Sequence, residues 1–143
     1  MIDADLRRFS LFAGLEDPEL QLVAYLLESR ELAADECVWE EGQAADGLWL
    51  LDQGTLRFEM GGEGPLGRCA APAWFGGASL LAEAPREASA HAAGPARALV
   101  LSRTAFAQLL EAAPRTAARI LATLAGELAS VLRDGIAFTS PRR

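Results

Sequence analysis

The chain has 143 residues, of which 51% are apolar and 23% charged, and its net charge at neutral pH is −7. This length predicts one domain over residues 1–143 that needs no disulfides, and the apolar content excludes a disordered chain. Nucleic-acid binding requires clustered basic residues, so an acidic chain with scattered arginines is not expected to bind DNA or RNA.

The first part of the chain predicts helices at about residues 3–28. Asp17, Pro18 and Glu19 resemble a helix start, with an acidic N-cap, a proline at the first helical position and an acid in the first turn. Apolar residues then recur at helical spacing as far as Leu27. Four upstream apolar residues predict a short helical segment that packs on the same core: Leu6, Phe9, Phe12 and Leu15.

Between about residues 31 and 101, short apolar runs alternate with turn residues. The runs cover residues 37–39, 48–51, 55–58, 66–69, 88–92 and 96–101, and residues 61–65 have the composition of a hairpin tip. Short, regularly spaced strands of this kind are typical of an all-β sandwich or barrel.

The last part predicts two helices at about residues 103–135. Ser102 can cap a helix over residues 104–112, with Phe106, Leu109 and Leu110 directed to the core. A proline at residue 114 ends it, and a longer helix is expected over about residues 115–134, with Gly135 at its end.

The long final helix carries a continuous apolar stripe. The barrel or a second copy of the chain could cover it, and its length and breadth favour a homodimer. The residues expected at the dimer interface are Ile120, Leu124, Leu128 and Val131.

Composition argues against catalysis and against export from the cell. All 13 basic residues are arginine, and His91 is the single histidine, so Schiff-base chemistry and a multi-histidine metal site are excluded. Cys37 and Cys69 lack zinc-site spacing and are too few for a secreted disulfide framework. We expect no catalytic residue, metal, cofactor, signal peptide or membrane span, and a cytoplasmic location.

Residues 75–89 stand out as a segment suited to binding an anion. Gly76 and Gly77 follow an aromatic residue, a short helix-forming run and a proline turn come next, and Arg86 opens a strand. Glycines let backbone amides approach a ligand, and the first amides of a helix attract negative charge. The arginine offers a bidentate fork for a phosphate group.

This segment resembles the phosphate-binding cassette of cyclic-nucleotide-binding domains of the catabolite-activator type. Ser89 stands where threonine or serine is usual, and the residues that match are Phe75, Gly76, Leu80, Pro85, Arg86 and Ala88. Residues 9–15, 41–42, 48–56 and 106–114 also resemble family segments, in the family's order. The resemblance therefore covers nearly the whole chain.

The resemblance implies a mainly β fold with flanking α-helices: a jelly-roll β-barrel with N-terminal helices and a long C-terminal helix. It also implies a non-catalytic sensor that binds cyclic AMP, cyclic GMP or a similar small phosphate ligand. The expected ligand-binding residues are Phe75, Gly76, Gly77, Ala78, Ser79, Arg86, Glu87, Ala88 and Ser89. Arg86 would neutralise the phosphate, and a protein effector would read ligand-coupled movement of the C-terminal helices.

Two positions differ from the family pattern. Gly77 stands where the family has a glutamate that holds the ribose hydroxyl, and Glu87 stands where it favours a small neutral residue. The alternative hypothesis is therefore a ligand-free scaffold for protein–protein interaction; an enzyme in a cupin-like barrel is the weakest hypothesis. About eight residues follow Gly135, so we expect a stand-alone domain without a helix-turn-helix.

Overall fold

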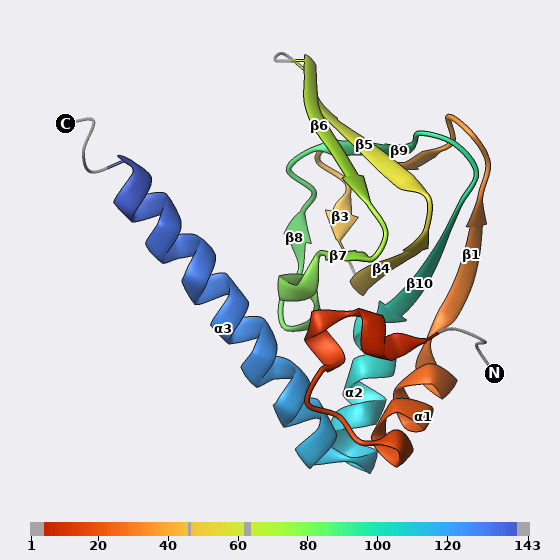
Figure 1. The fold of residues 1–143 in the computed structure, drawn as a ribbon, viewed down its shortest axis with the longest axis vertical. Helices are drawn as coiled ribbons and strands as arrows, with labels where there is room; N and C mark the ends of the chain where they lie inside the picture. Colours follow the sequence, from red (N-terminus) through yellow and green to blue (C-terminus); the bar gives the residue numbers. More distant parts are fainter. Residues whose placement is uncertain (1–4, 46, 62–63, 140–143) are drawn as a thin grey trace.

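The structure, a computed structural model, describes residues 5–45, 47–61 and 64–139, without the side chains of residues 128 and 131–139. Helices gather at one end of a β structure (Figure 1). The 3-10 helices η1 (Leu6–Arg8) and η2 (Ser10–Phe12) and the helix α1 (Asp17–Leu26) come first. The helices α2 (Arg103–Ala112) and α3 (Pro114–Thr139) follow the last strand.

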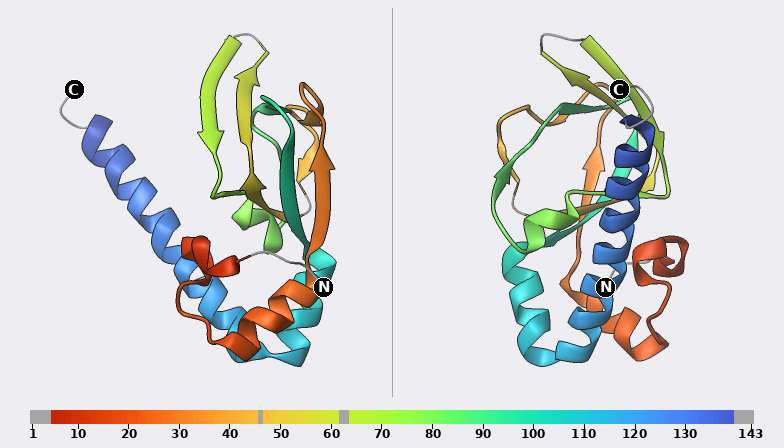
Figure 2. Two further views of the ribbon diagram at one scale, coloured as in Figure 1. Left: turned by 45° about the vertical axis from the view of Figure 1, so that its right-hand side comes forward. Right: turned by 90° about the vertical axis from the view of Figure 1, so that its left-hand side faces the viewer.

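The described strands form two four-stranded antiparallel sheets and one two-stranded sheet. The first has the order β1 (Glu28–Leu32), β10 (Ala96–Ser102), β4 (Gly47–Gln53), β7 (Ala73–Phe75). The second has the order β2 (Cys37–Trp39), β9 (Ser89–Ala92), β5 (Thr55–Met60), β6 (Gly64–Ala70), and β3 (Ala44–Ala45) pairs with β8 (Ala84–Pro85). The two larger sheets face each other (Figure 2), which confirms the predicted mainly β jelly-roll fold with flanking helices.

Strand β4 explains why the chain has two connected cores. Its residues alternate between them: Leu48 and Leu50 pack with the helices, whereas Trp49 and Leu51 pack between the sheets. Successive side chains of a strand point to opposite faces, so a strand buried on both faces reads as an uninterrupted apolar run. Burial of both faces of β4 therefore explains the apolar run predicted at residues 48–51.

The N-terminal helices differ from the prediction in detail. Glu16, not Asp17, is the N-cap of α1, because Glu16 and Glu19 form a reciprocal capping box. The upstream segment forms two 3-10 turns, and its four predicted core residues are all buried. At the end of β4 the buried Asp52 carboxylate lies 3.0 Å from Arg8 Nη1 and 3.2 Å from Arg97 Nε, which ties this segment to the first sheet.

Some short or polar strands were not predicted. β1 begins at Glu28, before the expected start of the β region, and four of its five residues are exposed. The two-residue strands β3 and β8 and the three-residue strand β7 are too short to show an alternating pattern. Their pairing depends on partners far away in the sequence.

The C-terminal helices confirm the Ser102 cap, whose hydroxyl accepts a hydrogen bond from Ala105 N at 3.0 Å. The inward placement of Leu110 is wrong: this side chain is 42% exposed, because Phe106 and Leu109 occupy the buried face of α2. Gly135 does not end α3, which continues to Thr139. One glycine costs a helix only about 1 kcal/mol relative to alanine, so the helix can pass through it.

The apolar stripe of α3 is covered in part by the chain itself. Ile120 is 0% exposed and Leu124 is 2% exposed, and both pack in the core formed with the N-terminal segment, so their assignment to a dimer interface is wrong. The side chains of Leu128 and Val131 lie outside the described residues. Toward its C-terminal end α3 diverges from the strands (Figure 1), and the homodimer stays a prediction. No described helix has both the length and the apolar character needed to cross a bilayer.

Leu124 joins α3 to the 3-10 helix η3 (Gly77–Leu80), which follows β7. A Cβ atom added to the buried Gly77 would lie 2.5 Å from Leu124 Cδ1 and 3.0 Å from Trp74 Cζ3. A side chain at Gly77 would therefore require the Leu124 side chain to move while α3 is packed in this position.

Glu19 joins α1 to α3 at the opposite end of the same core. Its carboxylate accepts hydrogen bonds from Thr116 Oγ1 at 2.7 Å, Arg119 Nη1 at 2.8 Å and the Glu16 amide at 3.0 Å. The Glu16 amide, the Thr116 hydroxyl and the Arg119 charge hold the pKa of Glu19 below its ordinary value of 4.5. The ionised carboxylate therefore stabilises the folded state.

We expect Glu19→Gln to lower the free energy of unfolding at neutral pH. A depressed folded-state pKa gives stability that is present above the unfolded-state pKa and is lost as the pH falls through the folded-state value. Urea unfolding from pH 7 to pH 3 should therefore show the wild type losing its advantage over the variant as the solution is acidified. Glu111→Gln, on the exposed surface of α2, is the matched control. A difference that does not depend on pH would contradict the prediction.

We expect Gly77→Ala to lower the free energy of unfolding by about 1–3 kcal/mol, because the new methyl group overpacks the contact with Leu124. In a Leu124→Ala background the same change should cost less, since truncation removes the nearest atoms. Gly94→Ala is the control, because nothing lies within 4 Å of an added Cβ there. Thermal and urea unfolding measure the loss of stability in both backgrounds. Equal losses on Gly77→Ala would show that the contact with Leu124 does not cause the destabilisation.

Candidate functional site

A cavity of about 520 Å³ lies beside the segment predicted to bind a ligand. This volume falls within the range of small-molecule sites in proteins. Of the predicted ligand-binding residues, those that line it are Phe75, Gly76, Gly77, Ala78, Arg86, Glu87 and Ala88. The rest of the lining comes from Trp39, Ala45, Phe58, Trp74, Ala84 and Pro85. The fold thus brings most of the predicted site together around one hollow.

Three aromatic rings form one wall of the cavity. The centroids of Phe58 and Phe75 are 5.2 Å apart, and the Trp39 centroid lies 6.4 Å and 6.3 Å from them, respectively. Edge-to-face and tilted contacts at these distances are favourable for aromatic pairs. This wall is apolar, which suits an aromatic ring in a ligand.

Arg86 supplies positive charge to the cavity. Its backbone is held against the chain between β2 and β3: Arg86 N donates to Gln43 O, and Gly42 N donates to Arg86 O, both at 2.8 Å. The half-buried guanidinium lies over the Trp39 ring, with Cζ 4.1 Å from the centroid. A Cβ atom on Gly76 would lie 2.6 Å from Arg86 Nη1, so the missing side chain at this left-handed position (φ +76°) makes room for the guanidinium.

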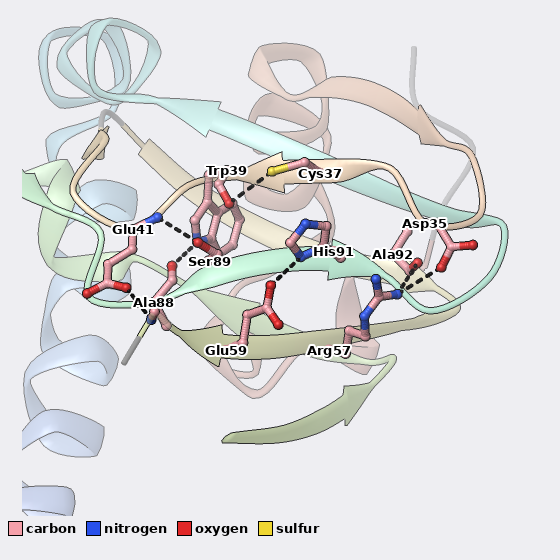
Figure 3. A network of polar contacts seen from close by, with 11 residues as sticks. Asp35, Cys37, Trp39, Glu41, Arg57, Glu59, Ala88, Ser89, His91 and Ala92 are labelled. Atoms are coloured by element: carbon pink, nitrogen blue, oxygen red, sulfur yellow. Dashed lines mark hydrogen bonds and ion pairs between the residues drawn. The ribbon is translucent and has the colours of Figure 1, made fainter. Parts of the chain in front are cut away.

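The indole under Arg86 is itself fixed. Trp39 Nε1 donates a hydrogen bond to Ala88 O at 3.0 Å (Figure 3). The ring packs edge-to-face on Trp49 at 5.4 Å, and Trp39 is 6% exposed. The residue pattern did not identify Trp39 as part of the site, because its role depends on strand β2 meeting the segment after β8.

Ser79 and Ser89, predicted to bind the ligand, do not line the cavity. The buried Ser79 hydroxyl donates to Gly47 O at 2.7 Å, which ties η3 to β4. Ser89 Oγ accepts from Glu41 N at 2.9 Å (Figure 3), which ties β9 to the turn after β2. Arg103, also missed from the sequence, donates to Ser79 O at 2.9 Å and to Ala45 O at 3.0 Å. These contacts support the cavity walls.

Charged residues also gather on β5, on β9 and in the turn before β2, outside the cavity lining. His91 Nδ1 lies 3.8 Å from Glu59 Oε1, and Arg57 Nη1 lies 3.0 Å from Asp35 Oδ1 (Figure 3). Reduced hydration, with the charges of Glu40 and Glu59, raises the pKa of the Cys37 thiol, which is therefore protonated at neutral pH. Within the described part of the chain, no three His, Cys, Asp or Glu side chains are placed to hold a metal ion.

Comparison with known proteins places this geometry in a family. The family model described as "Cyclic nucleotide-binding domain" matches residues 29–113. The cAMP-dependent protein kinase regulatory subunit of Emericella nidulans is 31% identical over 111 residues, which cover 77% of this chain and 27% of that protein. The chain thus spans about a quarter of the length of this curated relative.

Similar solved structures support the same family assignment. The Thermus thermophilus catabolite activator protein is 27% identical, with a TM-score of 0.77 over 89% of this chain and 60% of that one. The N-terminal domain of a transcriptional regulator from Streptomyces coelicolor A3(2) has the same fold, with a TM-score of 0.81 and 23% identity over 94% of this chain and 97% of that one. The resemblance first drawn from residues 75–89 is therefore confirmed, and the chain belongs to the cyclic nucleotide-binding domain family.

Proposed function

We propose that this chain is a regulatory sensor domain that binds a cyclic nucleotide in the cavity beside Arg86. The observation that carries the proposal is the half-buried Arg86 guanidinium in the wall of a cavity that is otherwise mainly apolar. A guanidinium in such a wall offers a phosphate group a charge-assisted, bidentate contact. The regulatory relatives support the sensor role.

The phosphate would bind between Arg86 and the start of η3. The first amides of a helical turn have no acceptor within the turn, and the first internal bond of η3 is donated by Ser79 N to Gly76 O. The amides of Gly77 and Ala78 precede that bond and belong to residues that line the cavity. They are suited to the oxygens of a cyclic phosphate.

The base would pack on the aromatic wall. A second hollow of about 370 Å³ shares Phe58, Phe75 and Ala88 with the first, so the two together extend along that wall. Stacking of a base on an aromatic side chain contributes about 1–3 kcal/mol. Cyclic AMP is the first ligand to test, because the matched kinase subunits are named as cAMP-dependent.

Signalling would pass from the cavity to α3 through Leu124. Gly77 lines the cavity and also touches Leu124, so a ligand that shifts η3 changes the packing of α3. A ligand moves such an equilibrium only by binding one arrangement more tightly than the other. We place the surface read by an effector, or by a second copy of the chain, on the part of α3 beyond Leu124.

One observation favours the ligand-free scaffold as the second candidate. Gly77 cannot supply the carboxylate expected from the family, and Leu124 lies where a side chain at that position would begin. A lost charge-assisted hydrogen bond costs about 1.5–3 kcal/mol, or about one to two decades of affinity. Glu87 also brings a negative charge to the lining of the cavity. The scaffold would keep the fold and the α3 surface without a ligand.

Titration calorimetry with cyclic AMP and cyclic GMP separates the two candidates. We expect saturable binding of at least one of them, and a loss of about 100-fold in affinity on Arg86→Gln, because a charge-assisted bidentate contact contributes about 3 kcal/mol. Arg30→Gln is the matched control: Arg30 also lies over a tryptophan, with Cζ 5.7 Å from the Trp49 centroid, but does not line the cavity. Absence of binding to the wild type would favour the scaffold, whereas equal losses in both variants would show that Arg86 does not hold the phosphate.

A further inference from the structure

We infer that Trp39 is a positioning residue of this site, whose indole face holds the Arg86 guanidinium where a ligand phosphate must meet it. The inference rests on the proposed function and deepens it. It depends on three residues from separate segments, Trp39 of β2, Gly76 after β7 and Arg86 after β8, which we call the guanidinium clamp.

The clamp has a rigid base. Trp39 is 6% exposed, its only ring N–H is bonded to Ala88 O at 3.0 Å, and Trp49 and Phe75 pack against it edge-on at 5.4 and 6.3 Å. An indole held in this way cannot turn without breaking a hydrogen bond and two aromatic contacts. The surface beneath the guanidinium is therefore fixed before any ligand arrives.

Gly76 limits the position of the Arg86 guanidinium on a second side. Arg86 Nη1 lies 2.6 Å from the place that a Cβ atom on Gly76 would take, so the arginine packs directly on the backbone there. Arg86 Cζ is at the same time 4.1 Å from the Trp39 centroid. Contacts with two separate segments, and a main chain bonded to Gly42 and Gln43, leave the side chain little freedom to lose on binding.

The chemistry of the guanidinium makes an aromatic ring suitable for holding Arg86 in position. Its charge is attracted to the π face of an indole, whereas its N–H groups point outward in its own plane. A platform under the face therefore positions the group through a contact that does not use hydrogen-bond donors.

The alternative is that Trp39 only fills the core, since it belongs to the buried cluster between the sheets. Leu32 distinguishes the two roles. It belongs to the same cluster, is 5% exposed, and does not line the cavity. Replacing either residue should destabilise the fold, but only replacement of Trp39 should displace Arg86.

The first experiment tests the clamp without nucleotide, by tryptophan emission of the free protein. We expect Arg86→Gln to change the emission of the wild type, because a cation over an indole shifts its excited-state energy. The same change in a Trp39→Phe background should leave the emission unaltered, while Trp49→Phe should not remove the effect. If Arg86→Gln does not alter the wild-type emission, the inference is overturned.

The second experiment tests positioning, by calorimetric titration with cyclic AMP and cyclic GMP. We expect affinity to fall roughly 5- to 30-fold in Trp39→Leu and about threefold in Trp39→Phe, in the order of their cation–π strength. Leu32→Ala should stay within about twofold of the wild type despite a loss of melting temperature. Equal losses in Trp39→Leu and Leu32→Ala would show a purely structural role and overturn the inference. A wild type that binds no nucleotide overturns the proposed function and the positioning role with it, whereas the emission result still decides whether the clamp exists.

Discussion

The proposed function depends on the contact between the Arg86 guanidinium and the Trp39 indole. The chain carries a net charge of −7, so its overall field disfavours an anionic ligand. Physiological salt screens such fields beyond about 8 Å, and the groups in the cavity wall therefore decide whether an anion binds. Stacking on Trp39 and packing on Gly76 keep a cation in that wall. The jelly roll supplies the three segments that meet at this point.

A second contact links the same cavity to the helical end of the molecule. Gly77 faces the cavity and touches Leu124, and α3 is joined in turn to α1 through Glu19, Thr116 and Arg119. A change at η3 thus has a short route through packed side chains to two helices. The absence of a side chain at Gly77 has two consequences in this view: it removes one ligand contact expected from the family, and it allows α3 to pack closely on the cassette.

The sequence predicted those features that local chemistry decides. Uninterrupted or alternating apolar runs located the longer strands, Ser102 located the start of α2, and the glycines with Arg86 located the cavity. What it could not predict depends on contacts between distant segments. From the sequence alone, Trp39 is an ordinary core residue, because its contact with Arg86 forms only when β2 meets the segment after β8. In the same way, Ile120 and Leu124 have the pattern of a dimer face, but the N-terminal segment covers them in the fold. Ser79 and Ser89 fit the family pattern, yet their hydroxyls bond to the backbone of neighbouring strands.

The proposed function requires that Arg86 meets the phosphate of a cyclic nucleotide inside the cavity. The most direct measurement is nitrogen-15 NMR of the arginine side chains during titration with cyclic AMP and cyclic GMP, with the Arg86 signal assigned by its loss in Arg86→Gln. We expect a saturable downfield shift of the Arg86 Nε–H proton, while the signal of Arg30, which lies outside the cavity, stays in place. A titration that moves signals of other arginines and leaves Arg86 unchanged would contradict it.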